Sequence, residues 1–172
     1  SWEPAWPALE RLRKGGAPVI INSSKTAAEI EQLRQEIDNR HPFITENGSA
    51  ICIPTGYFDP GTQPGATAPD SYEIQTFGPA RSEILNLLHD LRTTAEYQFR
   101  GFADMEPAEV ADLTGLSIEG AALARQRLAS EPIIWDGSDE ALQQFRLELE
   151  EANLKLLKGG RFFHVMGPVD KA

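Results

Sequence analysis

The first informative pattern in the chain is a short run of branched apolar residues followed by polar ones. Residues 18–21 (Pro-Val-Ile-Ile) predict a strand buried on both faces, as found inside a parallel sheet. Thr26 and Glu29 then form a capping-box pattern, which predicts a helix over residues 27–37. The face of this helix that we expect to be buried carries Ile30, Leu33 and Ile37.

The rest of the first third repeats this rhythm. Residues 4–14 predict an amphipathic helix that stops at a glycine pair, and strands are expected over 42–48 and 50–53. Alternating helices and strands are typical of a doubly wound α/β sheet. Residues 54–71 are rich in glycine and proline, which predicts a long loop and a domain boundary.

After this loop the order of elements changes. The pattern predicts short helices after Pro107 and over 117–128, and longer ones over 81–95 and 139–152. Strands are expected over 72–77, 97–102, 132–135, 154–157 and 161–166. This mixed order indicates a separate α+β module.

Charge and composition narrow the classes of partner. The formal net charge is −10 in 172 residues, which argues against nucleic acid and anionic membranes as partners. No run approaches the length of a membrane span and there is no signal-peptide pattern. Cys52 is the single cysteine, so a reducing, cytoplasmic setting is expected. Both ends of the sequence look like cuts through a longer polypeptide, and the oligomeric state is not predicted.

The segment after the first strand is a candidate anion site. Ligands of open α/β sheets gather at the carboxyl ends of the strands. An anion there would meet the hydroxyls of Ser23 and Ser24, the free amides of the helix N-terminus and the ammonium of Lys25. The same residues are equally compatible with a strand, a helix cap and a solvated lysine.

Other candidate residues carry weaker signals. Arg161 and His164 follow a glycine pair, where they either line a pocket rim or belong to an edge strand. Arg127 lies near a helix end, where it either caps the last carbonyls or binds substrate. His41 and His89 are expected at the surface, and no zinc-type cluster, Walker loop or nucleophile elbow is present.

Several short segments form a recognisable ordered set: residues 19–26 (VIINSSKT), 44–48 (ITENG), 56–58 (GYF), 101–105 (GFADM), 109–116 (EVADLTGL), 130–132 (SEP), 159–164 (GGRFFH) and 170–171 (DK). No single segment is specific, but the ordered set is. Taken in order, these segments resemble one family, the mannosyl-3-phosphoglycerate phosphatases of the haloacid dehalogenase superfamily.

The resemblance implies a fold and a division of the chain. The fold is α/β, a partial Rossmann-like core with an inserted α+β cap domain. Residues 1–54 would form part of the core, 55–165 the cap, and 166–172 the return to the core. Sheet order would be incomplete, because the first strand of the family's core has no counterpart here.

The resemblance also implies site residues and a cofactor. Ser23 would bind the phosphoryl oxygen, and Lys171 would orient the nucleophile and the phosphate. The substrate, a phosphorylated sugar–glycerate, would be held by Lys25, Asn47, Arg127, Ser130, Arg161 and His164. The family uses Mg²⁺ and an aspartyl-phosphate intermediate, which water hydrolyses.

The sequence departs from the family in one decisive respect. It contains no Asp-x-Asp-Gly-Thr segment, which supplies the nucleophile, and no acidic metal-binding loop. No side-chain ligand for the metal is therefore predicted in this chain, and the chain alone is expected to be inactive. The alternatives are a non-catalytic sugar-phosphate-binding remnant and another capped phosphatase of the same superfamily, and mannosyl and glucosyl substrates are not distinguished.

Overall fold

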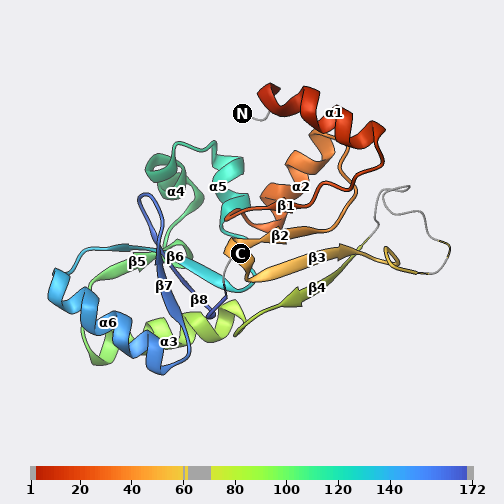
Figure 1. Cartoon of the computed structure of the whole chain (residues 1–172). Helices are drawn as coiled ribbons and strands as arrows, with labels where there is room; N and C mark the ends of the chain where they lie inside the picture. The colour runs from red at the N-terminus through yellow and green to blue at the C-terminus, as the bar shows by residue number, and fades with distance from the viewer. Residues whose placement is uncertain (1–2, 60, 62–70, 170–172) are drawn as a thin grey trace.

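The structure is a computed structural model that describes residues 3–59, 61 and 71–169. Its elements form two four-stranded sheets with helices packed on them (Figure 1). In chain order they are η1 (Glu3–Ala5), α1 (Trp6–Lys14), β1 (Ile21–Asn22), α2 (Ala27–Glu36), β2 (Phe43–Thr45), η2 (Glu46–Gly48), β3 (Ala50–Pro54), β4 (Tyr72–Thr76), α3 (Arg81–Thr94), β5 (Phe99–Gly101), η3 (Phe102–Asp104), α4 (Pro107–Thr114), α5 (Ile118–Ala124), β6 (Ser130–Trp135), α6 (Asp139–Glu151), β7 (Lys155–Lys158) and β8 (Phe163–Met166).

The first sheet has the strand order β1-β2-β3-β4, in which β1 runs parallel to β2 and the other pairs are antiparallel. Helix α2 covers one face of this sheet, where Ile30 packs against Phe43 and Cys52. The predicted capping box is present: Thr26 Oγ1 accepts the Glu29 N–H, and the Glu29 carboxylate accepts the Thr26 N–H. The sequence thus places the start of α2 correctly.

The first strand differs from its prediction. It contains only Ile21 and Asn22, and Ile20 is 45% exposed rather than buried. Within the described residues β1 pairs with β2 alone, so it lies at the edge of the sheet. Branched residues are typical of a strand that is buried inside a sheet. Among the described residues, however, no second strand lies beside β1 on the side away from β2.

The buried face of α2 also differs in one position. Ile30 is buried as expected, whereas the second fully buried residue is Arg34. Its guanidinium lies 4.6 Å from the centre of the Phe43 ring, donates to the backbone oxygen of His41 at 3.0 Å, and bonds the Tyr72 hydroxyl. Arginine is tolerated here because Nη1 and Nη2 donate to protein acceptors and the guanidinium lies over an aromatic ring, although Nε has no hydrogen-bond partner among the described residues.

The second sheet has the strand order β5-β6-β8-β7 and is antiparallel throughout. Helices α3 and α6 cover one face, and α4 and α5 cover the other (Figure 1). The predicted contacts of Leu142, Phe145 and Leu149 in α6 are confirmed, because all three are buried in the core. The predicted helices agree with the structure within a few residues at each end. None of the described helices is long and apolar enough to cross a membrane.

Strand β4 belongs to the first sheet by its hydrogen bonds. It pairs with β3 along its whole length, from Ala50 opposite Thr76 to Pro54 opposite Tyr72. The chain therefore passes between the sheets after residue 76, although the predicted cap domain begins at residue 55. The division into core and cap stays a prediction, and residues 60 and 62–70 of the predicted loop lie outside the described residues.

Two connecting segments cross between the sheets in close contact. A Cβ atom added to Gly78, whose φ is +106°, would lie 2.9 Å from the Cα of Gly167. A Cβ added to Gly167 would lie 2.8 Å from the Phe77 carbonyl oxygen. Glycine is required at this crossing by both the backbone conformation and the space.

We predict that Gly78→Ala lowers the free energy of unfolding by about 2 kcal/mol or more, because the methyl group meets backbone rather than a flexible side chain. Gly160→Ala is the matched control, since an added Cβ there meets nothing within 4 Å. Urea unfolding of both variants measures the effect. Equal stability of the two variants would show that the crossing tolerates a side chain.

Candidate functional site

The loop between β1 and α2 is held by bonds to its carbonyl groups. The Ser23 oxygen accepts the Asn47 N–H at 3.0 Å, and the Lys25 oxygen accepts the Glu46 N–H at 3.0 Å. The Thr45 hydroxyl also donates to the Lys25 oxygen. These donors all come from the end of β2 and from η2, which lie beside the loop because β1 and β2 are parallel neighbours.

The remaining carbonyl of the loop is bonded from the second sheet. Arg127 Nη2 donates to the Ser24 oxygen at 3.2 Å. The oxygens of Ser23, Ser24 and Lys25 therefore all point toward protein donors. Since these carbonyl oxygens already accept bonds from the protein, the open side of the loop, which faces solvent, presents hydrogen-bond donors.

Several donors remain on the open side. Ser23 Oγ accepts the Lys25 N–H at 3.2 Å, so the hydroxyl proton of Ser23 is directed elsewhere. Among the described residues the amide of Ser24 has no hydrogen-bond partner, and Ala27 and Ala28 lie in the first turn of α2, where amides have no intrahelical acceptor. Amides and hydroxyls at a helix N-terminus suit an anion such as a phosphoryl group.

Lys25 contributes less positive charge than its sequence position suggests. Its ammonium forms an ion pair with Glu29 Oε1 at 2.7 Å, and its side chain is 49% exposed. The same carboxylate caps the Thr26 amide. The cation is near the loop, but it is already partly neutralised.

Glu46 is the most heavily bonded side chain between the two sheets. Its carboxylate is completely buried and accepts the N–H groups of Leu128 and Ala129 at 2.6 and 3.2 Å. It also accepts the Ser130 hydroxyl at 2.6 Å and lies 3.6 Å from Arg127 Nε. Glu46, in η2 directly after β2, thus holds the turn 127–130, which leads into the second part of the molecule, the second sheet and its helices.

The backbone at Glu46 adopts an unusual conformation. Glu46, Asn47 and Gly48 have φ angles of +52°, +61° and +96°. A left-handed conformation costs an L-residue such as glutamate roughly 1 kcal/mol or more. It persists when the surrounding contacts fix it, as the bonds of the Glu46 carboxylate do here.

Arg127 and Ser130, predicted as substrate contacts, belong to this cluster. Arg127 Nε donates to Ser130 Oγ at 2.9 Å, and burial lowers the pKa of the guanidinium. Their polar groups are directed at Glu46 and the Ser24 carbonyl. A direct role for either residue in substrate binding stays a prediction.

A second buried carboxylate lies next along β6. Glu131 is fully buried, bonds Arg81 and accepts the Ala103 N–H at 2.7 Å. Burial raises the pKa of Glu131, although Arg81 opposes this effect. All of these bonds stay within the second part of the molecule, in contrast to those of Glu46.

The structure separates Arg161 and His164 from the junction. Ser130 pairs with Met166 at the junction end of β8, whereas His164 pairs with Pro132 further along. Arg161 precedes the strand, in the turn between β7 and β8 at the opposite end of β8 from Met166, and is exposed. Ser23, Lys25, Asn47, Arg127 and Ser130 are brought together, but Arg161 is not shown to join them. Lys171 lies outside the described residues.

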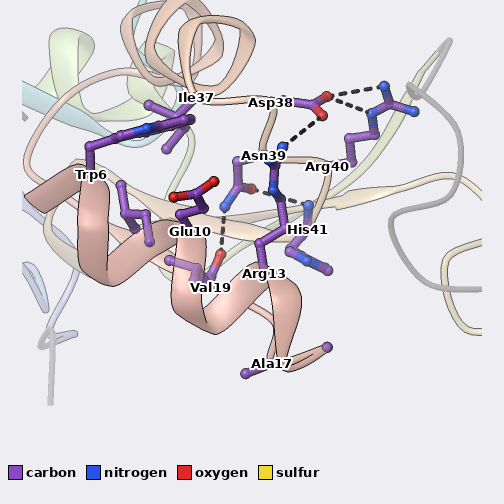
Figure 2. Close-up of a pocket in the computed structure, with 12 residues that line it drawn as sticks. Trp6, Glu10, Arg13, Ala17, Val19, Ile37, Asp38, Asn39, Arg40 and His41 are labelled. Atoms are coloured by element: carbon purple, nitrogen blue, oxygen red, sulfur yellow. Dashed lines mark hydrogen bonds and ion pairs between the residues drawn. The ribbon is translucent and has the colours of Figure 1, made fainter. Parts of the chain in front are cut away.

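Two hollows occur elsewhere. The larger, of about 360 Å³, lies between α1 and residues 37–41 (Figure 2). Asp38 forms ion pairs with Arg13 and Arg40 there, and Asn39 donates to the Val19 oxygen. The other, of about 210 Å³, is lined by α3, η3 and Glu131. Neither is lined by a predicted site residue.

The described residues do not fit a magnesium site. No three histidine, cysteine, aspartate or glutamate side chains within them converge on a point where an ion would be held. Glu46 and Glu131 are each satisfied by protein donors. Any metal ligands of a complete phosphatase would have to come from other residues.

Comparison with known proteins gives the fold. No family model matches the chain. A Thermoplasma acidophilum protein is 16% identical, with a TM-score of 0.61 over 98% of this chain and 57% of its own. A haloacid dehalogenase-like hydrolase from B. subtilis (11% identity, TM-score 0.53, 96% of this chain and 67% of its own) is also similar. Another from Bacteroides thetaiotaomicron shares 14% identity with a TM-score of 0.56, over 95% of this chain and 62% of its own.

These likenesses confirm the predicted fold class. The chain is an α/β protein with the fold of haloacid dehalogenase-like hydrolases. It spans about three fifths of the length of most of these structures. The mannosyl-3-phosphoglycerate phosphatase resemblance is finer than a fold likeness and is taken up as a proposal below.

Sequence reasoning missed the importance of Glu46. In the segment Glu46-Asn47-Gly48 the sequence predicts a role for Asn47 alone, as a substrate contact. The available signal was Asn-Gly after a short strand, a pair that favours left-handed turns. Nothing in the sequence indicates that the preceding glutamate bonds residues more than 80 positions away.

The environment of His41 generates a prediction about pH. Burial and the nearby Arg34 lower the pKa of His41 below its usual 6.5, and its Nδ1 lies 2.8 Å from the Tyr57 hydroxyl. The unfolded chain therefore binds this proton more readily than the folded one. We expect His41 to reduce the free energy of unfolding as the pH falls below about 6.5.

The measurement is urea unfolding at pH 7.5 and pH 5.5. The loss of stability between these values should be smaller in His41→Gln than in the parent. His89→Gln, at an exposed position of α3, is the control and should keep the parental difference. An unchanged pH dependence in His41→Gln would contradict the prediction.

Proposed function

We propose that this chain is the phosphate-binding portion of a phosphatase of the haloacid dehalogenase type. The observation that carries the proposal is the arrangement of the loop after β1, whose three carbonyls are bonded inward. The open side then presents the Ser23 hydroxyl, the Ser24 amide and the N-terminus of α2. The likeness of fold to hydrolases of that type supports the same assignment.

Binding of a phosphate monoester at this loop follows from its donors. Two phosphoryl oxygens would accept bonds from the Ser23 hydroxyl and the Ser24 amide. The partial positive charge at the start of α2 adds roughly 0.3–1 kcal/mol at an exposed site. Lys25 would add to this attraction once the anion competes with Glu29 for its ammonium.

The chain does not carry the chemistry of hydrolysis by itself. The sequence holds no Asp-x-Asp pair that would supply a nucleophile and an acid or base. Catalysis is proposed only for a protein that also contains that segment and the ligands of its Mg²⁺ ion. In such a protein Ser23 would bind the phosphoryl oxygen, and Lys171 would act beside it.

The proposed substrate is a phosphorylated sugar–glycerate, mannosyl-3-phosphoglycerate or its glucosyl analogue. This choice rests on the ordered segments that resemble that phosphatase family. Asn47 lies next to the loop, and Arg161 has an exposed guanidinium on the second part of the molecule. Arg161 and His164 would contact the sugar–glycerate part of the ligand from the second sheet.

A non-catalytic binding protein is the second candidate. It is favoured by the lack of a nucleophile segment, because a loop that binds phosphate without an aspartate holds its ligand unchanged. Both candidates predict binding at Ser23. They differ in whether the protein with its flanking residues releases phosphate from a phosphomonoester.

We predict that inorganic phosphate and 3-phosphoglycerate bind this chain weakly, and that Ser23→Ala weakens binding about five- to tenfold by removing one hydroxyl donor, equivalent to a hydrogen bond of about 1–1.4 kcal/mol. Titration followed by ¹H–¹⁵N spectra measures the affinity and shows whether the Ser24 amide shifts.

Ser82→Ala, on the exposed surface of α3, is the matched control and should bind like the parent. Absence of any shift at Ser24 at 50 mM phosphate would rule out the proposed site. Shifts that are equal in the parent and Ser23→Ala would place the anion elsewhere.

A further inference from the structure

We propose that Glu46 is a positioning residue that couples the phosphate-binding loop to the orientation of the second sheet. Its carboxylate accepts hydrogen bonds from the turn 127–130, and Arg127 of that turn donates to the Ser24 carbonyl oxygen. The inference concerns regulation of the proposed phosphate site, and that part of it rests on the proposed function.

The hydrogen bonds of the Glu46 carboxylate all reach one turn before the second sheet. The carboxylate of Glu46 accepts bonds from three consecutive residues, Leu128, Ala129 and Ser130. Ser130 is the first residue of β6, a central strand of the second sheet. Any rotation of that sheet relative to the first must therefore move or break the contacts of this one carboxylate.

The same turn and Glu46 itself also contact the loop between β1 and α2. The Glu46 N–H donates to the Lys25 oxygen, so the same residue touches the loop through its backbone. Arg127, beside the carboxylate, reaches the Ser24 oxygen. A third contact joins the parts nearby, because Thr26 Oγ1 donates to the Leu123 oxygen at 2.9 Å. The loop is thus bonded to both sheets at adjacent residues.

Glu46 is both fully buried and in a strained backbone conformation. A fully buried carboxylate on a left-handed backbone is costly unless its acceptors are filled. Every donor to its oxygens comes from residues 128–130. Glu46 therefore favours the one relative orientation of the sheets in which these donors are present.

Further contacts join the two parts of the molecule beside this turn. The two connecting segments cross at Gly78 and Gly167, close to the first residue of α3, whose amide donates to the Leu128 oxygen. Helix α2 contacts α5 beside the same turn (Figure 1).

The test measures the distance between the sheets. Nitroxide labels at Gln32→Cys in α2 and Gln143→Cys in α6, both exposed positions, report it by double electron–electron resonance. Cys52 is 1% exposed and burial raises its thiol pKa to about 11, so it stays unlabelled. Ser24 and Lys25 amide resonances report the loop, and titration with inorganic phosphate reports binding.

Glu46→Gln replaces one acceptor oxygen with a donor that faces N–H groups. We expect a broadened and shifted distance distribution, displaced Ser24 and Lys25 resonances, and phosphate affinity reduced about tenfold. Glu131→Gln is the matched control, because it is equally buried but bonded only within the second part. It should lower the melting temperature without changing the distance or the loop resonances.

A parental distance distribution in Glu46→Gln, or equal changes in Glu131→Gln, would overturn the proposal. If Glu46→Gln does not fold, Glu46→Asp decides, because it keeps the charge but its shorter side chain cannot reach residues 128–130 together. A parental distribution in Glu46→Asp would overturn it equally. If the parent protein does not bind phosphate, the proposed function is wrong. The distance and loop measurements would still decide the role of Glu46.

Discussion

The bonds of one buried carboxylate connect the two halves of this molecule. Glu46 is the first residue of η2, directly after β2, and its carboxylate accepts hydrogen bonds from the turn that leads into β6. A buried charge is stable only when its lone pairs are used, so the turn and the glutamate require each other. The left-handed backbone of residues 46–48 accompanies these bonds, which help to fix it.

The loop that we propose as a phosphate site, residues 23–26, depends on the same arrangement. Its carbonyls accept bonds from η2 on one side and from Arg127 on the other, which leaves hydroxyl and amide donors exposed. The affinity of such a loop for an anion comes from preorganised donors rather than from net positive charge. The proposed binding of a phosphate ester is compatible with a net charge of −10, because local donors act at contact distance, whereas the charges of the rest of the protein are largely screened.

Two fully buried carboxylates, Glu46 and Glu131, have their hydrogen-bond partners in different parts of the molecule. Glu131 bonds α3 and η3, and so stabilises the second sheet internally. Glu46 bonds across the junction. Glu46 and Glu131 are equally buried, so the proposed role of Glu46 in orientation rests on the location of its partners and not on its burial.

The sequence alone determined the local elements and the fold class. The capping box at Thr26, the apolar face of α6 and the order of strands and helices follow from patterns within one or two turns of chain. It also placed Ser23 and Lys25 at a strand end, because parallel sheets put ligands there. Only the tertiary structure decided that Ile20 is exposed, that Arg34 is buried, and that Arg127 and Ser130 bond Glu46. These outcomes depend on pairings between residues tens of positions apart, and no local pattern encodes which distant donor a buried carboxylate will meet.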